Sequence, residues 1–348
     1  MWNEIATNYT LRIVLIGIGL LGAVSGIVGV FLTLRKQALI GDALSHAALP
    51  GIVLAYMLTE RSTLYVSILG AIAASALSIL FIELIKRYSI IKNDALLAVI
   101  LSSMFGLGQV FLSVIRDTAG QDQARLNTFI FGQAATMSQE DVLFIALILG
   151  LVFLTVISFW RHMKAYVFDH DFYLSLGYPG IVINVIINAL AILVIVSGIQ
   201  SVGVILMSAL LIAPSVSARL WSNRLGSNVI LSALIGALSG VFGTLYGIDT
   251  STGPVIVIFA SGFVVFSILC APGKGILWMK ISSLIHVHQV KKYHALIHLF
   301  ETNELVDHPD HMTQKLLEEG YMVRMNGTYE LTPKGQKKVS SIMVGELK

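Results

Sequence analysis

Long apolar runs constrain this chain more than any other feature of its sequence. A helix of about 20 apolar residues crosses the hydrocarbon core of a bilayer, and the backbone of such a segment must satisfy its own hydrogen bonds. Only 12% of the 348 residues are charged, against about 25% in soluble domains. The sequence therefore predicts an all-α polytopic membrane protein with about eight or nine transmembrane helices. We place the spans near residues 11–33, 38–58, 64–84, 95–115, 140–159, 180–198, 203–218, 228–247 and 254–271.

The distribution of basic residues predicts the orientation of these spans. With the N-terminus outside, the cytoplasmic connections contain eleven Lys and Arg residues and the opposite side contains four. Cytoplasmic loops are generally the more basic ones, so we expect the N-terminus outside and the C-terminus in the cytoplasm. The polar stretch 116–139 is compatible with a short re-entrant helix, which would change the number of spans.

Two ionisable residues stand out in the second span, residues 38–58. Asp42 and His46 lie inside this otherwise apolar run, at a spacing that places both side chains on one face of a helix. Ionisable residues within a membrane span are costly and often mark an ion or substrate pathway. A carboxylate oxygen and an imidazole nitrogen can together bind Zn²⁺ or Mn²⁺. The alternative is that the pair only hydrogen-bonds within the helix bundle. No other apolar span has an ionisable residue in its interior, and this favours a transport pathway.

Two prolines interrupt predicted spans. Pro50, followed by Gly51, comes one turn after His46, and Pro214 lies in the seventh span. A proline removes a backbone hydrogen bond and bends a helix. Two bent helices near the Asp42 and His46 pair could form a gate, although bent helices also occur in static bundles.

Small and amide residues predict how the helices pack. GxxxG spacing occurs at Gly22–Gly26 in the first span and at Gly236–Gly240 in the eighth. This spacing lets helix backbones approach closely. Asn184 and Asn188 form another i, i+4 pair, which we interpret as interhelical hydrogen-bond partners rather than as part of the pathway.

A cytoplasmic loop at residues 161–179 has an unusual apolar content. Phe168, Phe172, Tyr173 and Leu176 could form one apolar face of a short helix. An exposed face of this kind indicates a protein partner; a helix lying flat on membrane lipid is the alternative.

The C-terminal residues 281–348 have a polar, soluble composition. Two helical segments, a hairpin with Asn326–Gly327 at its turn and a final helix after Pro333 together resemble a winged-helix domain. Residues 288–348 contain eight basic and eight acidic residues. Because phosphate contacts need a basic face, nucleic acid binding is not expected. This region contains six histidines, among them His294 and His298 at i, i+4 spacing. We interpret them as ordinary solvent-exposed side chains; the alternative is a regulatory metal site.

Catalytic motifs are missing from the sequence. It contains no GxxxxGK[ST] phosphate loop, no HExxH pair and no GxSxG elbow. The chain is therefore not expected to be an enzyme, and active transport would need a separate source of energy.

Several motifs resemble one known family. GDALSHAALPG (41–51), preceded by LRKQALI (34–40), resembles the signature of the permease subunits of manganese, zinc and iron ABC importers in the bacterial plasma membrane. VGVILMSALLIAPSVSA (202–218) and FIFG (129–132) also match that family's pattern, and the likeness covers roughly residues 10–275.

The resemblance implies several partners and site residues. It implies cytoplasmic ATPase subunits, an extracellular metal-binding protein that delivers the ion, and a second permease subunit. It also implies that Asp42 and His46 coordinate the transported metal, with no bound cofactor, and that residues 165–178 engage the ATPase. The segment predicted to make this contact includes Phe168, Asp169, Phe172, Tyr173, Leu176 and Gly177.

We therefore expect a permease domain at residues 1–280 and a cytoplasmic winged-helix-like domain at 281–348. The expected function is ATP-driven import of a divalent transition metal ion. Manganese and zinc are the favoured ions, with iron as a further candidate. A mixed oxygen and nitrogen site does not separate manganese from zinc. The alternative is a membrane-tethered, metal-responsive regulator that acts through its C-terminal domain.

Overall fold

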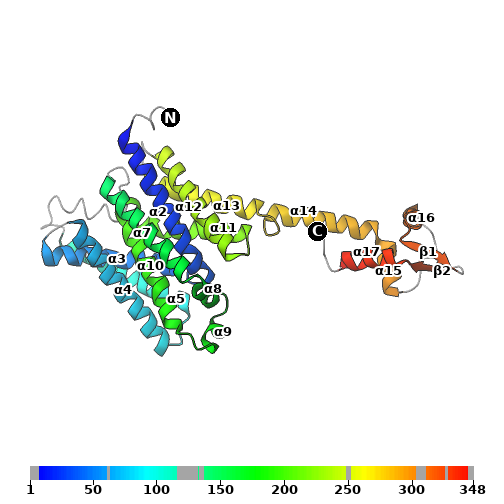
Figure 1. Ribbon diagram of the computed structural model, residues 1–348, viewed down its shortest axis with the longest axis horizontal. Coiled ribbons are helices and arrows are strands. Elements are labelled where there is room, and N and C mark those ends of the chain that lie inside the picture. Colours follow the sequence, from blue (N-terminus) through cyan, green and yellow to red (C-terminus); the bar gives the residue numbers. More distant parts are fainter. Residues whose placement is uncertain are drawn as a thin grey trace. The chain divides into compact units, whose positions relative to one another are not determined.

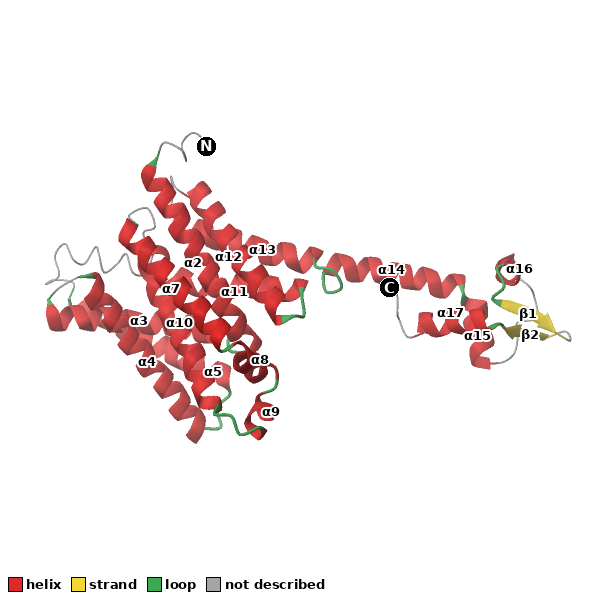
Figure 2. Ribbon diagram, in the orientation of Figure 1, coloured by secondary structure: helices red, strands yellow, loops and turns green. Residues whose placement is uncertain are grey.

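The structure is a computed structural model that describes residues 8–60, 63–115, 132, 137–247, 252–302, 311–325 and 328–343. The chain separates into two compact units, residues 1–268 and 269–348 (Figure 1). The described part of the first unit is entirely helical, and the second adds one small hairpin (Figure 2). Each unit is described by itself below.

All nine predicted spans form helices. Eight are long and apolar enough to cross a membrane. The ninth, α11, has 18 residues. The polar stretch 116–139, which is compatible with a re-entrant helix, lies largely outside the described residues. Helix α7 begins at its end, with a capping box formed by Ser138 and Asp141. The nine helices are α2 (Tyr9–Leu34), α3 (Leu39–Thr59), α4 (Leu64–Tyr88), α5 (Asn93–Val114), α7 (Gln139–Ser158), α10 (Gly180–Val202), α11 (Val204–Trp221), α12 (Leu225–Gly247) and α13 (Thr252–Cys270).

Helix α2 packs closely against α12 through the two GxxxG segments, which confirms the packing prediction. A Cβ atom added at Gly22 would collide with the backbone carbonyl of Gly236, and one at Gly236 would collide with that of Gly22. One turn along, the Ser232 hydroxyl donates a hydrogen bond of 2.8 Å to the Gly26 carbonyl. The two backbones are therefore in direct contact, as small residues at this interval allow.

Helix α3 is held on several sides by other helices of the bundle. A Cβ atom at Gly51 would collide with the carbonyl of Gly70 on α4, so these two backbones also touch. On the other side, Gly108 of α5 leaves room for Leu49 and the ring of Pro50. Pro50 and Pro214 lie inside α3 and α11, each of which continues past its proline. The surroundings of α3 are therefore fixed near its middle, about one turn beyond His46.

Two short helices connect α7 to α10. They are α8 (Trp160–Phe168) and α9 (His170–Ser175), separated by Asp169. The Asp169 side chain accepts a hydrogen bond of 3.0 Å from the Phe172 amide and so caps α9. Gly177 follows with a φ of +79°, a conformation that favours glycine. The predicted single helical face is thus divided between two helices.

The second unit contains α14 (Ile276–Lys292), α15 (His294–Thr302), α16 (His311–Glu318), β1 (Met322–Met325), β2 (Thr328–Leu331) and α17 (Pro333–Met343). The two strands pair antiparallel, with Met322 opposite Leu331. The predicted turn at residues 326–327 lies outside the described residues. The hydrophobic core of the second unit includes Tyr293, Leu296, Leu316 and Val339. Helix, helix, hairpin and helix follow in the predicted order, although the boundary expected at residue 280 falls inside α14. The division into membrane and cytoplasmic domains stays a prediction.

Candidate metal site and coupling segment

Asp42 and His46 meet on α3 at a distance suited to binding one ion. The Oδ1 atom of Asp42 lies 3.5 Å from Nε2 of His46. Two donors about 2.1 Å from a tetrahedral ion lie roughly 3.4 Å apart. The helix therefore presents the two groups at close to the spacing of two ligands of one transition metal ion, without a change in the backbone.

The pair lies nearer the end of α3 than the sequence suggested. Asp42 is in the first turn of the helix. With a rise of about 1.5 Å per residue, His46 is roughly 10 Å from the N-terminal end. The Asp42 side chain is 30% exposed and that of His46 is 13% exposed. The first turn of a helix favours an acidic side chain because its unpaired N–H groups carry partial positive charge, and Asp42 occupies such a position.

His46 is held by packing rather than by a network of hydrogen bonds. Its ring contacts the Phe105 ring edge-on, with centroids 5.0 Å apart. Its Nδ1 atom is buried and has no hydrogen-bond partner among the described residues. Because a proline nitrogen has no hydrogen, Pro50 cannot donate to the His46 carbonyl as another residue would. A backbone oxygen without its helical partner therefore lies beside the imidazole.

A cavity of about 340 Å³ opens beside Asp42. Its walls come from α3, from Ser208, Ala209 and Ala213 on α11, and from Val264 on α13. The small residues of α11 leave the space next to the carboxylate. Ser45, although close in sequence, is fully buried and donates a hydrogen bond of 2.8 Å to the Gly41 carbonyl of its own helix. Asp42 thus faces open space, and Ser45 does not.

Among the described residues, Asp42 and His46 form a group of two. No group of three or more His, Cys, Asp or Glu side chains able to hold a metal occurs within the part of the chain that the structure describes. In the second unit, the rings of His294 and His298 are stacked with centroids 6.3 Å apart. They form no such group within the described residues, so the structure gives no support to a regulatory metal site there.

The predicted coupling segment shows an exposed apolar surface, with one correction. Phe168, Phe172 and Leu176 are exposed, and Phe172 is 56% exposed. Tyr173, which the sequence placed on the same face, is only 2% exposed. The prediction treated residues 168–176 as one helix, but Asp169 starts a new one, and Tyr173 turns inward to stack on Tyr178 at a centroid distance of 5.3 Å. Burial raises the pKa of the Tyr173 phenol, which therefore stays neutral at physiological pH.

Comparison with known proteins identifies the family to which the first unit belongs. A model of the ABC 3 transport family matches residues 7–271. The chain belongs to the ABC 3 transport family. The manganese transport system membrane protein MntC of Bacillus subtilis is 37% identical over 294 residues, which cover 84% of this chain and 68% of that protein. The zinc transport system membrane protein TroC of Treponema pallidum is 40% identical over 275 residues, covering 78% and 92%.

A solved structure has the same fold as this ABC 3 chain. PsaBC from Streptococcus pneumoniae, in complex with Fab, contains a chain that is 31% identical and aligns with a TM-score of 0.70. The alignment covers 80% of this chain and 98% of that one. The resemblance to metal ABC importer permeases is confirmed, and this chain is a multi-pass protein of the bacterial plasma membrane, a transport subunit rather than an enzyme. The family match ends before α14, so the winged-helix assignment stays a prediction.

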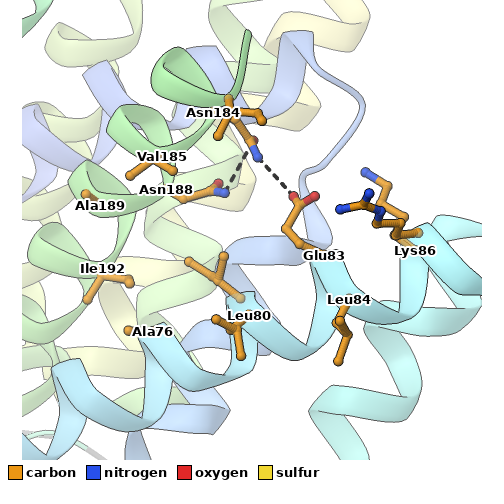
Figure 3. Close-up of a pocket in the computed structure, with 13 residues that line it drawn as sticks. Ala76, Leu80, Glu83, Leu84, Lys86, Asn184, Val185, Asn188, Ala189 and Ile192 are labelled. Carbon is orange, nitrogen blue, oxygen red and sulfur yellow. Dashed lines mark hydrogen bonds between the residues drawn. The ribbon is translucent and has the colours of Figure 1, made fainter. Parts of the chain in front are cut away.

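The structure of this ABC 3 chain also contains a polar junction that the sequence analysis did not assemble. Asn184 of α10 donates a hydrogen bond of 3.0 Å to the Glu83 carboxylate of α4 (Figure 3). The same amide accepts a hydrogen bond from the guanidinium of Arg35, the residue that follows α2. The guanidinium in turn lies 5.4 Å from the centroid of the Tyr166 ring on α8. The interhelical role predicted for Asn184 is confirmed. The predicted span 64–84 placed Glu83 at its end, but α4 continues to Tyr88.

We expect this junction to stabilise the bundle. In Asn184→Leu, the Glu83 carboxylate and the half-buried Arg35 guanidinium lose their shared amide. A buried polar group left unpaired costs on the order of 1–3 kcal/mol. The thermal unfolding midpoint of the purified protein in detergent should fall. Val182→Ala, an exposed change on the same helix, should leave the midpoint unaltered; equal midpoints for both variants and the parent would contradict the prediction.

Proposed function

We propose that this chain is the permease subunit of an ATP-driven importer for a divalent transition metal ion, manganese or zinc, with iron a further candidate. The observation that supports this most strongly is the 3.5 Å separation of the Asp42 and His46 donors beside an open cavity, in a member of the ABC 3 transport family. The names of the related proteins, manganese and zinc transport system membrane proteins, support the same cargo.

Asp42 and His46 would hold the ion briefly and then release it. One carboxylate and one imidazole make a weak site for a transition metal, and a conduit must bind weakly enough to let the ion leave. The unpartnered Nδ1 of His46 also fits transient binding, because tightly bound metal sites usually anchor the second ring nitrogen. In the neutral imidazole, the proton would reside on Nδ1 so that Nε2 can bind the metal.

A second permease subunit would complete the coordination. Structural zinc sites use four protein ligands and catalytic ones use three plus water, but the described residues of one chain bring only Asp42 and His46 together here. A second copy, or a paralogue with the same motif, would bring a matching pair to the open side of Asp42. Four donors from two chains would also allow release when the subunits move apart.

The other partners follow from the family and from the two ends of the bundle. The exposed Phe168, Phe172 and Leu176 surface of α8 and α9 suits docking to cytoplasmic ATPase subunits. An extracellular metal-binding protein would deliver the ion at the other end. In this proposal the N-terminus would lie outside and the C-terminus in the cytoplasm, and the excess of basic residues in the cytoplasmic loops supports this orientation.

Helices α3 and α11 are the candidates for the gate. Pro50 and Gly51 lie one turn beyond His46, and Pro214 lies in the helix that lines the cavity beside Asp42. Each proline removes one backbone hydrogen bond. ATP binding and hydrolysis by the partner would then switch these helices between outward-open and inward-open arrangements.

The function is tested by metal uptake. Cells with the complete transporter and cells lacking only this chain should be compared for accumulation of radioactive Mn²⁺, Zn²⁺ and Fe²⁺ and for total metal content. Uptake of at least one ion should fall to background without the chain. Unchanged uptake of all three, in cells with no other importer for them, would refute the proposal.

The coupling surface has its own test. We expect Phe172→Asp to reduce metal-dependent ATP hydrolysis by the complex at least tenfold, because an apolar contact of an interface would receive an unpaired charge. Phe172 is 56% exposed, so the fold should survive. Phe172→Leu retains an apolar side chain and should retain most of the activity. Full coupling in Phe172→Asp would exclude this surface as the ATPase contact.

A further inference from the structure

A long groove between α4 and α10 lies apart from the metal site. Its volume is about 840 Å³ (Figure 3). Most of its wall is apolar, with Leu80 and Leu84 from α4 and Val185 and Ile192 from α10. Ala76 and Ala189 also line the groove, and their small side chains leave space between the two helices. The polar residues Glu83, Lys86 and Arg87 gather at one end, while the other end is apolar.

The length of the groove equals that of half a bilayer. On α4 it runs from Lys86 to Ala76, and on α10 from Ile181 to Ile192. Ten or eleven helical residues rise about 15 Å, and the hydrocarbon core of a bilayer is about 30 Å thick. The groove therefore extends from the ends of two membrane-spanning helices to about the middle of the membrane, as one leaflet does.

The polar end of the groove carries net positive charge. Neither Lys86 nor Arg87 forms an ion pair with a carboxylate of the described residues; the Arg87 guanidinium lies 5.9 Å from the centroid of the exposed Tyr88 ring. Glu83, the one carboxylate in the groove wall, is hydrogen-bonded by Asn184, which also bonds Arg35. Arg35 lines an adjoining cavity of about 520 Å³ that shares Glu83 and Lys86. Arg35 thus balances Glu83, and the charges of Lys86 and Arg87 are left over.

We propose that this groove binds one anionic glycerophospholipid. The phosphate binds between Lys86 and Arg87, and an acyl chain lies along Ala76 and Ala189 toward Ile192. Basic pockets between transmembrane helices suit anionic head groups. The proposal depends on the membrane location of the chain and not on the metal site. In the proposed topology, the lipid belongs to the cytoplasmic leaflet.

The test uses the full transporter complex in nanodiscs of phosphatidylcholine with a small fraction of a photoactivatable phosphatidylglycerol. Mass spectrometry should locate the label on α4 and α10. Labelling of Lys86→Gln/Arg87→Gln should be on the order of tenfold weaker. Lys92→Gln/Arg224→Gln removes two exposed basic residues elsewhere and should label as the parent does. A photoactivatable phosphatidylcholine should show no difference between the two double variants.

A second variant separates the acyl chain from the head group. Ala189→Trp fills the groove and leaves both cations in place, so labelling should again fall, whereas soluble glycerol 3-phosphate should not compete. A shared unfolding midpoint checks that each variant is folded. Equal labelling of all variants overturns the proposal. Competition by glycerol 3-phosphate would show a phosphate site that binds no acyl chain. Labels that link the groove to a second copy of this protein would show a subunit interface. Either result also overturns the proposal.

Discussion

Metal uptake should be abolished in Asp42→Ala and in His46→Ala. Each change removes one of the two donors of the proposed site, which lie 3.5 Å apart on one face of α3. A site with so few ligands cannot lose one and still replace the hydration shell of the ion. The Asp42 side chain is 30% exposed, so its truncation leaves no large void, whereas His46→Ala also removes the ring contact with Phe105. Uptake of radioactive Mn²⁺ or Zn²⁺ into cells should therefore fall to background for each variant.

The control for this pair lies between them in the sequence. Ser45→Ala removes a hydroxyl that donates to its own helix at Gly41, and it should retain nearly full uptake. Amounts of protein in the membrane and co-purification with the ATPase should be equal for all three variants. Normal uptake in both Asp42→Ala and His46→Ala would refute the site. Loss of uptake in Ser45→Ala as well would indicate that α3 as a whole is sensitive.

The second large effect is expected where the backbones of α2 and α12 touch. Gly22→Ala places a methyl group against the backbone carbonyl of Gly236. A flexible side chain could move away, but a carbonyl can only move with its helix. The two helices must therefore separate and lose contacts along their length. We expect a destabilisation of about 3 kcal/mol or more, seen as a lower unfolding midpoint and a smaller yield of monodisperse protein in detergent.

The same substitution elsewhere provides the matched control. A methyl group added at Gly150 of α7 meets no atom within 4 Å. Because alanine favours a helix more than glycine does, Gly150→Ala should leave the stability unaltered or raise it slightly. If Gly22→Ala and Gly150→Ala had the same midpoint, α2 and α12 would not be packed as described.

The sequence by itself predicted the features that depend on local chemistry. All nine spans follow from apolar runs, because a segment in hydrocarbon has few options other than a helix. The spacing of Gly22 with Gly26 indicated a close helix contact, and that of Asp42 with His46 indicated one shared face, since helical geometry alone brings such residues together. The family also followed from sequence, since its signature is continuous in the chain.

Only the tertiary structure decided features that depend on contacts distant in sequence. The two GxxxG segments are more than 200 residues apart, and nothing in either one names its partner. The junction of Arg35, Asn184 and Glu83 links the end of α2 to α4 and α10. In the sequence, only the spacing of Asn184 and Asn188 indicated an interhelical contact there. Tyr173 turned inward because Asp169 begins a new helix and the rings of Tyr166 and Tyr178 pack against it. Helical periodicity tells which residues share a face, but packing against other helices decides whether that face is covered.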